Sequence, residues 1–159
     1  GSRHVVAGMV MNNQLTDFAF RPSIQGRPVA NRRRPGKRPM SSMAPLIVFE
    51  NNQPVLAVGS PGGRTIPHFI SRVLMASLFW ALPPEQSVAM PHLSIRGNRL
   101  VAERDSPIPW PFALTELSRG EQEIKSQPLN SGIALLQRIH GRWHGVADPR
   151  REGAAMALP

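Results

Sequence analysis

Short apolar runs separated by polar or glycine-containing turns make up much of the chain, and this pattern predicts antiparallel β-hairpins. Three pairs of runs fit it: Leu46 to Phe49 with Pro54 to Val58, Leu93 to Arg96 with Arg99 to Glu103, and Ile133 to Ile139 with Trp143 to Ala147. Gly97-Asn98, between the second pair, is a dipeptide typical of two-residue turns. We therefore expect three hairpins.

A longer segment, Thr65 to Leu82, has helical periodicity instead. It places Phe69, Val73 and Phe79-Trp80 near the spacing of one helix face, which predicts a helix packed on the core. A second, short helix is predicted from Phe112 to Arg119, ending at the glycine that follows.

Two segments near the start of the sequence complete the pattern. His4 to Met11 predicts a single short strand, whereas Arg21 to Arg38 is rich in proline, glycine and arginine and predicts a loop. The sequence contains no internal repeat and no sign of a second domain. It therefore predicts one α+β domain over residues 1–159.

Composition narrows the class of protein. The chain of 159 residues is 41% hydrophobic and 18% charged, which is typical of a globular protein with a sizeable core. Its longest apolar candidate, Phe69 to Leu82, is interrupted by polar residues and is too short for a membrane span, so none is expected. The absence of cysteine excludes disulfides, thiolate metal sites and cysteine nucleophiles.

The net charge of +9 is carried mainly by arginine, which supplies all but two of the 19 basic residues. Its planar guanidinium binds carboxylate and phosphate alike, so the charge leaves both kinds of anion open. The run Arg32-Arg33-Arg34 with Lys37 and Arg38 is compatible with nucleic-acid binding. No aromatic residue lies between Phe20 and Phe49 to stack on bases, so we favour a solvated loop and expect no nucleic-acid partner.

Two motifs bear on metal and phosphate chemistry. His140 and His144 have the spacing of a helical metal site, but Gly141 and the β-like alternation argue against a helix, so no metal is expected. Gly59-Ser60-Pro61-Gly62-Gly63 lacks the Lys-Ser/Thr ending of a nucleotide-binding loop and is not a GxSxG nucleophile elbow. Its glycine pair offers bare backbone N–H groups that suit an oxyanion, although a tight turn alone also explains it.

Further polar residues suit the two ends of an α-amino acid. Ser41-Ser42 adds hydroxyls that suit carboxylate or phosphate, while the segment Asn13-Gln14-Leu15-Thr16-Asp17 adds an amide and a carboxylate that suit an ammonium group. If these segments converge with the glycine pair, they form a pocket that recognises both ends of an amino acid beside an oxyanion site.

Four motifs, in order along the chain, carry a resemblance to a known family. NNQLTDF (Asn12 to Phe18), GKRPMSSM (Gly36 to Met43), GSPGG (Gly59 to Gly63) and ADPRREG (Ala147 to Gly153) resemble motifs of the gamma-glutamyltransferase small subunit. The resemblance extends over essentially the whole chain.

This resemblance implies a fold and a reaction. The fold is that of an N-terminal-nucleophile hydrolase, an αββα sandwich of antiparallel sheets with helices on the outer faces, of which this chain forms part. The family's precursor cleaves itself, and the threonine thereby exposed attacks a γ-glutamyl amide such as glutathione. Water or an acceptor then resolves the γ-glutamyl-threonine intermediate, and no cofactor is implied.

The motifs also carry implied roles for individual residues. These are α-carboxylate binding by Ser41 and Ser42, α-ammonium binding by Gln14 and Asp17, and oxyanion stabilisation by the backbone N–H groups of Gly62 and Gly63. Thr16 stands where the family often has an aspartate. The loop Ala19 to Pro35 lacks the aromatic lid residue of some members, so a more open pocket is expected.

The family's nucleophilic threonine is expected before Gly1. Thr16 and Thr65 do not replace it, because neither offers its own free α-amine as a base. We therefore expect the 159 residues to be inactive alone and to need the large subunit and the N-terminal part of the small subunit as partners. Missing strands would leave sheet edges that favour self-association. Family resemblance implies a periplasmic or secreted location.

Two alternatives stay open. A glutaryl-amide (cephalosporin-type) acylase shares the fold, but glutaryl groups lack the α-ammonium, so Asp17 would be left without a partner and favours γ-glutamyl substrates. A basic nucleic-acid-binding or scaffold domain would use the run Arg32 to Arg38 and would leave the pocket motifs without a role.

Overall fold

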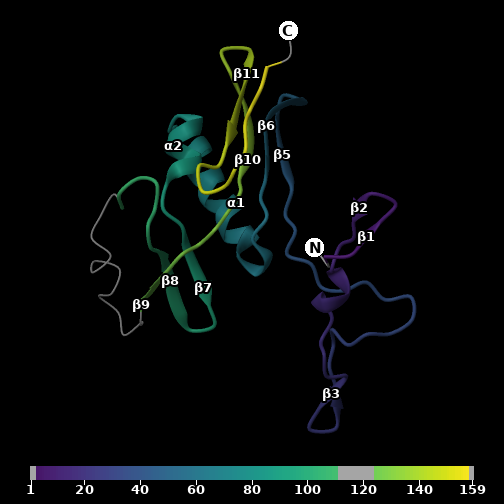
Figure 1. Ribbon diagram of the computed structural model, residues 1–159. Helices are drawn as coiled ribbons and strands as arrows, with labels where there is room; N and C mark the ends of the chain where they lie inside the picture. Colours follow the sequence, from purple (N-terminus) through teal and green to yellow (C-terminus); the bar gives the residue numbers. More distant parts are fainter. Residues whose placement is uncertain (1–2, 111–123, 158–159) are drawn as a thin grey trace. The chain divides into compact units, whose positions relative to one another are not determined.

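The computed structural model describes residues 3–110 and 124–157, so the helix predicted from Phe112 to Arg119 lies outside the described residues. The chain divides into two compact units, Gly1–Ser41 and Ser42–Pro159 (Figure 1). The first unit consists of short elements: β1 (Val5–Val6), β2 (Met9–Val10), the 3-10 helix η1 (Gln14–Asp17), β3 (Ser23–Ile24) and β4 (Arg27–Pro28).

The single strand predicted from His4 to Met11 is wrong, because this segment folds back on itself. β1 pairs antiparallel with β2, and Ala7 and Gly8 between them have φ angles of 50° and 76°. Two consecutive residues in the left-handed region make the tight turn that joins short strands. A second small hairpin, β3 with β4, turns at Gln25-Gly26 in the same way inside the predicted loop.

The second unit contains a four-stranded antiparallel sheet in the order β11-β10-β6-β5. Its strands are β5 (Leu46–Glu50), β6 (Gln53–Gly59), β10 (Ala134–Ile139) and β11 (Arg142–Ala147). The first and third predicted hairpins are thereby confirmed. Asn51-Asn52 closes one and His140-Gly141 the other, all four residues having positive φ.

A smaller sheet contains β7 (Leu93–Arg96), β8 (Arg99–Glu103) and β9 (Ile124–Gln127). β7 and β8 form the predicted hairpin over Gly97-Asn98, and Gly97 has a φ of 62°. β9 pairs parallel with β8, a pairing that the hairpin pattern did not predict.

Four helical segments lie between the two hairpins β5-β6 and β7-β8: η2 (Gly63–Thr65), α1 (Ile66–Leu74), the π-helix η3 (Met75–Phe79) and α2 (Pro84–Ala89). The predicted helix is thus confirmed, with Phe69 and Val73 buried. Phe79 and Trp80, however, are 74% and 53% exposed, so their predicted place in the core is wrong. The π-helical turn adds a residue per turn and rotates the side chains that follow off the buried face.

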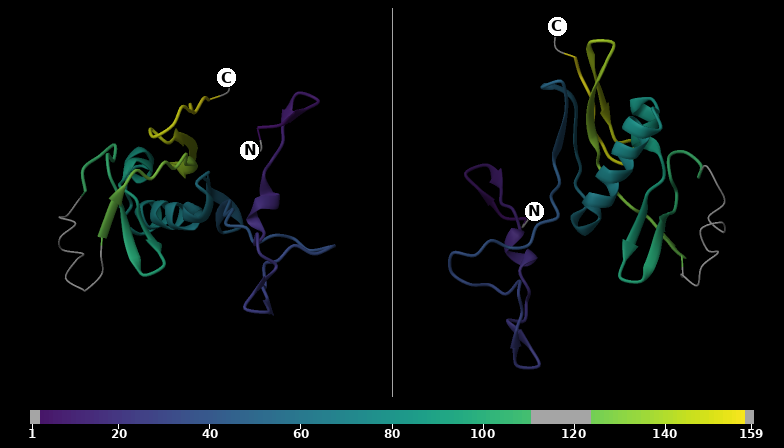
Figure 2. Two further views of the ribbon diagram at one scale, coloured as in Figure 1. Left: turned by 60° about the horizontal axis from the view of Figure 1, so that its bottom comes forward. Right: turned by 180° about the vertical axis from the view of Figure 1, so that it is seen from behind.

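The main core lies between the four-stranded sheet and the helices, which Figure 1 and Figure 2 show on one side of the sheet. Leu56 and Val58 on β6 and Leu135 on β10 pack with apolar residues of α1. Alternate residues point to the opposite face, where Ile47 and Leu136 are about half exposed. One helix-covered face and one further apolar face fit the predicted part of an αββα sandwich.

Candidate functional site

The predicted glycine turn follows β6 and leads directly into η2 and α1. Gly62 has a φ of 142°, and Gly63 has a φ of 59°, conformations that side chains rarely adopt. A Cβ at Gly62 would lie 2.6 Å from Cε2 of Phe69, a buried ring of α1. Residue 62 therefore has to be glycine for the turn to rest against the core.

The carbonyl oxygens of Gly62 and Gly63 accept hydrogen bonds from residues that follow them and from a serine. Gly62 O accepts from Thr65 Oγ1 at 2.7 Å, and Gly63 O accepts from the backbone N–H of Ile66. Gly63 O also accepts from Ser42 Oγ at 2.8 Å. Among the described contacts, each hydrogen bond to this glycine pair uses a carbonyl oxygen. The role predicted for the two N–H groups stays a prediction.

Ser42 is thereby brought to the glycine turn across 21 residues of sequence, so two of the predicted motifs meet within the second unit. Ser42 is half-buried, whereas its neighbour Ser41, the last residue of the first unit, is exposed.

The two residues predicted to hold an ammonium group lie together on η1 in the first unit. Gln14 and Asp17 are both exposed there, and Thr16 Oγ1 closes the turn by donating to Asn13 O at 2.7 Å. Asn31, which sequence reasoning missed, donates from Nδ2 to Asp17 O at 2.6 Å. Its Oδ1 accepts from the backbone N–H of Met40 at 3.0 Å. One side-chain amide thus ties η1 to the segment that ends at Ser41.

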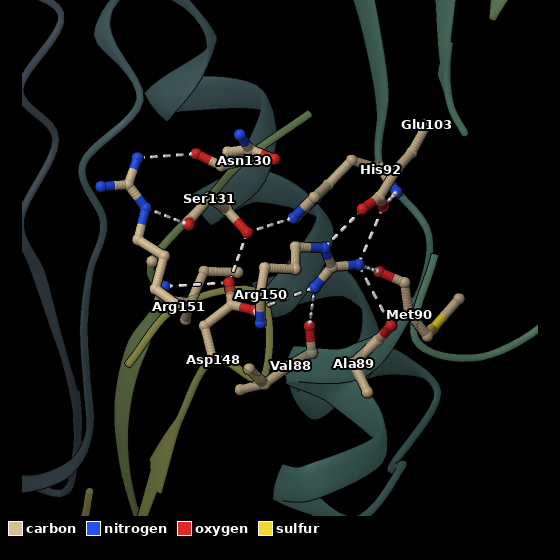
Figure 3. Close-up of polar contacts among 12 residues, drawn as sticks. Val88, Ala89, Met90, His92, Glu103, Asn130, Ser131, Asp148, Arg150 and Arg151 are labelled. Atoms are coloured by element: carbon tan, nitrogen blue, oxygen red, sulfur yellow. Dashed lines mark hydrogen bonds and ion pairs between the residues drawn. The ribbon is translucent and has the colours of Figure 1, made fainter. Parts of the chain in front are cut away.

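A buried polar cluster in the second unit, shown in Figure 3, includes Asp148 and Arg150 of the ADPRREG motif. The Arg150 side chain is only 5% exposed and forms an ion pair with Glu103, Nη2 to Oε2 being 2.8 Å. It also pairs with Asp148 at 3.1 Å and donates to the carbonyls that end α2. Buried charges have to be paired and hydrogen-bonded, and this guanidinium is fully used.

A directed chain of hydrogen bonds runs beside Arg150. Arg72 Nε donates to His92 Nδ1 at 3.0 Å, so the proton of the neutral imidazole is on Nε2. Nε2 then donates to Ser131 Oγ at 2.7 Å, and Ser131 Oγ donates to Asp148 Oδ2. Although histidine, serine and aspartate are linked, all three are buried, so we interpret the chain as support for the fold.

Burial and neighbouring charges set the protonation of this cluster. Burial lowers the pKa of His92 to about 2, and the positive charges of Arg72 and Arg150 act in the same direction. Burial alone would raise the pKa of Asp148, but hydrogen bonds from Ser131, Ile133 and Arg150 outweigh it and lower that pKa. Burial, helped by Arg150, lowers the pKa of Arg72 to about 10. At neutral pH the cluster holds two arginine cations, two carboxylates and a neutral imidazole.

Two further features, a cluster of metal-ligating side chains and a membrane-spanning helix, can be checked in the part of the chain that the structure describes. Within residues 3–110 and 124–157, no three His, Asp or Glu side chains gather as a metal site would require. In the same residues, no helix has the length and apolar character to cross a bilayer. His140 lies in the β10-β11 turn and His144 on β11.

Comparisons with known proteins support the family resemblance that the four sequence motifs carry. A sequence model of the gamma-glutamyltranspeptidase family matches residues 1–158. The glutathione hydrolase proenzyme of Bacillus subtilis (strain 168) is 32% identical over 154 residues, which are 95% of this chain and 25% of the relative. The acylase ACY 1 proenzyme of Pseudomonas sp. (strain SE83) is 26% identical over 152 residues, 95% of this chain and 26% of that relative. The chain thus spans about a quarter of the length of these curated relatives.

A solved structure shows the same fold. The gamma-glutamyltranspeptidase of Pseudomonas nitroreducens, solved with L-DON, is 27% identical and superimposes with a TM-score of 0.82. The match covers 100% of this chain and 88% of that one. The α+β architecture is therefore part of the αββα sandwich of N-terminal-nucleophile hydrolases, as predicted. On this evidence the chain belongs to the gamma-glutamyltranspeptidase family.

Proposed function

We propose that this chain forms part of an enzyme that hydrolyses or transfers γ-glutamyl groups through a γ-glutamyl-threonine intermediate. One observation supports the proposal most directly: Ser42 Oγ is bonded to Gly63 O, so the hydroxyl that we assign to carboxylate binding contacts the glycine turn that we assign to the oxyanion. Family membership supports it, and relatives named glutathione hydrolase point to glutathione and similar γ-glutamyl amides as substrates.

The proposed roles follow the chemistry of each group. The N–H groups of Gly62 and Gly63 stabilise the oxyanion, and removing such a donor costs about 3 to 4 kcal/mol of transition-state stabilisation. Ser41 and Ser42 bind the α-carboxylate. Because Ser42 has one hydroxyl proton and donates it to Gly63 O, it has to rotate away from that carbonyl when it donates to a substrate. Substrate binding is therefore coupled to the glycine turn.

We assign the α-ammonium group, which is on the same carbon as the α-carboxylate, to two residues of η1. There the Asp17 carboxylate pairs with the α-ammonium group, and the Gln14 amide accepts a hydrogen bond from it. Asn31 holds the backbone of η1 for this purpose.

In the proposed enzyme the nucleophile is a threonine of a preceding segment, and self-cleavage exposes it. Its oxygen attacks the γ-carbonyl, its proton passes through the free α-amine to the departing amine, and water or an acceptor amine then takes the γ-glutamyl group. The large subunit and the N-terminal part of the small subunit are the proposed partners, since the relatives are named proenzymes. We place the enzyme in the periplasm or outside the cell.

The test is release of 4-nitroaniline by the full-length parent from γ-glutamyl-4-nitroanilide, run beside glutaryl-4-nitroanilide. We expect turnover of the γ-glutamyl compound by the parent and none by the isolated 159 residues. Turnover of neither compound by a correctly cleaved parent would contradict the proposal.

A second candidate, a glutaryl-amide acylase, is supported by the similarity to acylase ACY 1. Asp17 decides between the two, because a glutaryl group has no ammonium to pair with its carboxylate. Asp17→Asn should lower kcat/KM for the γ-glutamyl anilide by about tenfold or more, the effect of losing a charged hydrogen bond. Asp105→Asn, at an exposed surface ion pair, is the matched control and should leave the rate unchanged. Turnover of the glutaryl anilide alone would establish the acylase instead.

A further inference from the structure

The loop from Asn31 to Met40 in the first unit carries a dense group of cations. Five of the eight basic residues of this unit lie in the loop, and Asp17 is the unit's one acidic residue. Arg33, Arg34 and Arg38 are exposed, and within the described residues no carboxylate forms an ion pair with any of them. The proposed reaction uses none of these three side chains, so their charge is available to a partner.

Hydrogen bonds at the base of the loop and inside it hold the cations together. Asn31 Oδ1 accepts from the backbone N–H of Met40 at 3.0 Å, which closes the loop at its two ends. Arg34 O accepts from the backbone N–H of Lys37 at 3.3 Å, and Lys37 Nζ donates to Ala30 O. Like charges that a closed loop keeps close repel one another, so an anionic partner lowers the energy of the loop.

Exposed apolar side chains accompany these cations. Phe20 is 87% exposed and lines a hollow of about 250 Å³ together with Arg33. On the β3-β4 hairpin, Ile24 is exposed and faces Arg27 across the strand pair. Figure 1 shows this hairpin and the loop extending away from η1 as two projections of the first unit. The first unit thus presents arginines and apolar side chains together on projecting segments.

We propose that these segments bind the surface of an anionic lipid bilayer. Guanidinium groups bind lipid phosphates, and each cation that reaches an anionic surface strengthens binding by about fivefold. Phe20 and Ile24 enter the headgroup region, where their side chains leave water. A soluble acidic polymer would pair with the arginines but would give these two apolar side chains no role, so the combination favours a bilayer.

Binding of this kind is peripheral and reversible, and it does not depend on the reaction that the enzyme catalyses. Its electrostatic part weakens as salt shortens the range of charge interactions, whereas its apolar part does not. An enzyme that acts in the periplasm or outside the cell would thereby be held at a membrane surface without a membrane-spanning helix.

The experiment measures cosedimentation of the full-length parent with vesicles of phosphatidylcholine alone and with vesicles that contain about one third phosphatidylglycerol. We expect tighter binding to the anionic vesicles at about 0.1 M salt and a large loss of binding at about 1 M salt. The double variant Arg33→Gln/Arg34→Gln should bind the anionic vesicles about 25-fold more weakly, since each cation contributes about fivefold. The control Arg138→Gln/Arg142→Gln removes the same charge from the exposed β10-β11 hairpin and should bind as the wild type does.

A second variant separates a lipid surface from a soluble polyanion. Phe20→Ser should weaken binding to the anionic vesicles by about tenfold, because the ring no longer leaves water, and should leave binding to heparin unchanged. Equal binding to the two kinds of vesicle, or a double variant that binds no more weakly than its control, would overturn the proposal. Binding to heparin but not to the anionic vesicles would assign the loop to an acidic polymer instead.

Discussion

At residue 62 the backbone takes a φ of 142°, and the ring of Phe69 fills the space that a Cβ would need. At residue 63 the φ of 59° is also unusual, but no atom lies within 4 Å of the Cβ position. The two glycines are therefore required for different reasons. Gly62 is fixed by contact with the core, whereas Gly63 is fixed by backbone conformation alone.

This difference predicts unequal effects of the same substitution. Gly62→Ala should lower the free energy of unfolding by about 3 kcal/mol, because it combines backbone strain with overpacking against Phe69. Gly63→Ala should cost only about 1 kcal/mol, the usual penalty for a left-handed non-glycine residue. Urea unfolding of the parent and both variants measures the two values. Equal losses would show that Phe69 does not constrain the turn.

Among the elements, α2, β8 and the end of β11 are joined by Arg150. Its guanidinium bonds Glu103 on β8, the carbonyls of Val88, Ala89 and Met90, and Asp148 directly after β11. Each of these elements is short, and a short helix or strand has little stability of its own. Arg150 supplies the contacts that fix their mutual arrangement.

Removing this guanidinium should be costly. Arg150→Met leaves Glu103 charged, only 3% exposed and without its cation, so we expect a loss of about 3 to 5 kcal/mol in the free energy of unfolding. Adding Glu103→Gln should recover part of the loss, because only one of the two buried carboxylates that Arg150 pairs with, Asp148, is then left without its cation. Arg151→Met is the control, since Arg151 is exposed and its side chain bonds only the carbonyls of Ser131 and Asn130 among the described contacts. A loss as large in the control would contradict this account.

Hairpins and the main helix were predictable because their signals are local. Two-residue turns and apolar periodicity are properties of neighbouring residues, and they located the β5-β6, β7-β8 and β10-β11 pairs. The Ala7-Gly8 turn was missed because alanine rarely adopts a φ of 50°, and the parallel partner β9 was missed because it is distant in sequence.

The candidate site was predictable only where a motif marked it. The serine pair and the glycine turn were recognised from their motifs, yet their contact at Ser42 spans 21 residues and required the structure. Asn31 carries no motif. Arg150 lies in a recognised motif, but its role depends on Glu103, 47 residues away, and no local pattern indicates such a partner.

Over the whole molecule, charge is unevenly divided. Gly1–Ser41 contains eight basic residues and one acidic residue, so it carries +7 of the net charge of +9. Ser42–Pro159 is nearly neutral by comparison, and its buried cluster is balanced in charge. Self-repulsion therefore acts mainly within the first unit and weakens with added salt.

The second unit should be sensitive to acid. His92 has a pKa of about 2 in the folded protein and about 6.5 when unfolded, so the unfolded chain binds more protons between these pH values. The contribution of the neutral His92 to the free energy of unfolding is therefore fully present above pH 6.5. Below that pH it falls by about 1.4 kcal/mol per pH unit. Asp148, whose pKa is lowered by folding, adds to the loss below its unfolded value.

Urea unfolding of the parent at pH 7 and pH 5 measures this slope. His92→Gln, whose amide both accepts and donates, should show a shallower dependence on pH. His140→Gln, in an exposed turn, should keep the wild-type slope. An identical slope in all three proteins would rule out His92 as the source.

The position of Arg150 in the sequence also has a consequence for synthesis. Two of the elements that it joins, α2 and β8, are complete by residue 103, yet the ion that neutralises Glu103 leaves the ribosome almost fifty residues later. Until then a nascent chain that has collapsed around Glu103 keeps a charge that it cannot bury. The core therefore has to stay open to water during translation, and it closes only when the ADPRREG motif has emerged.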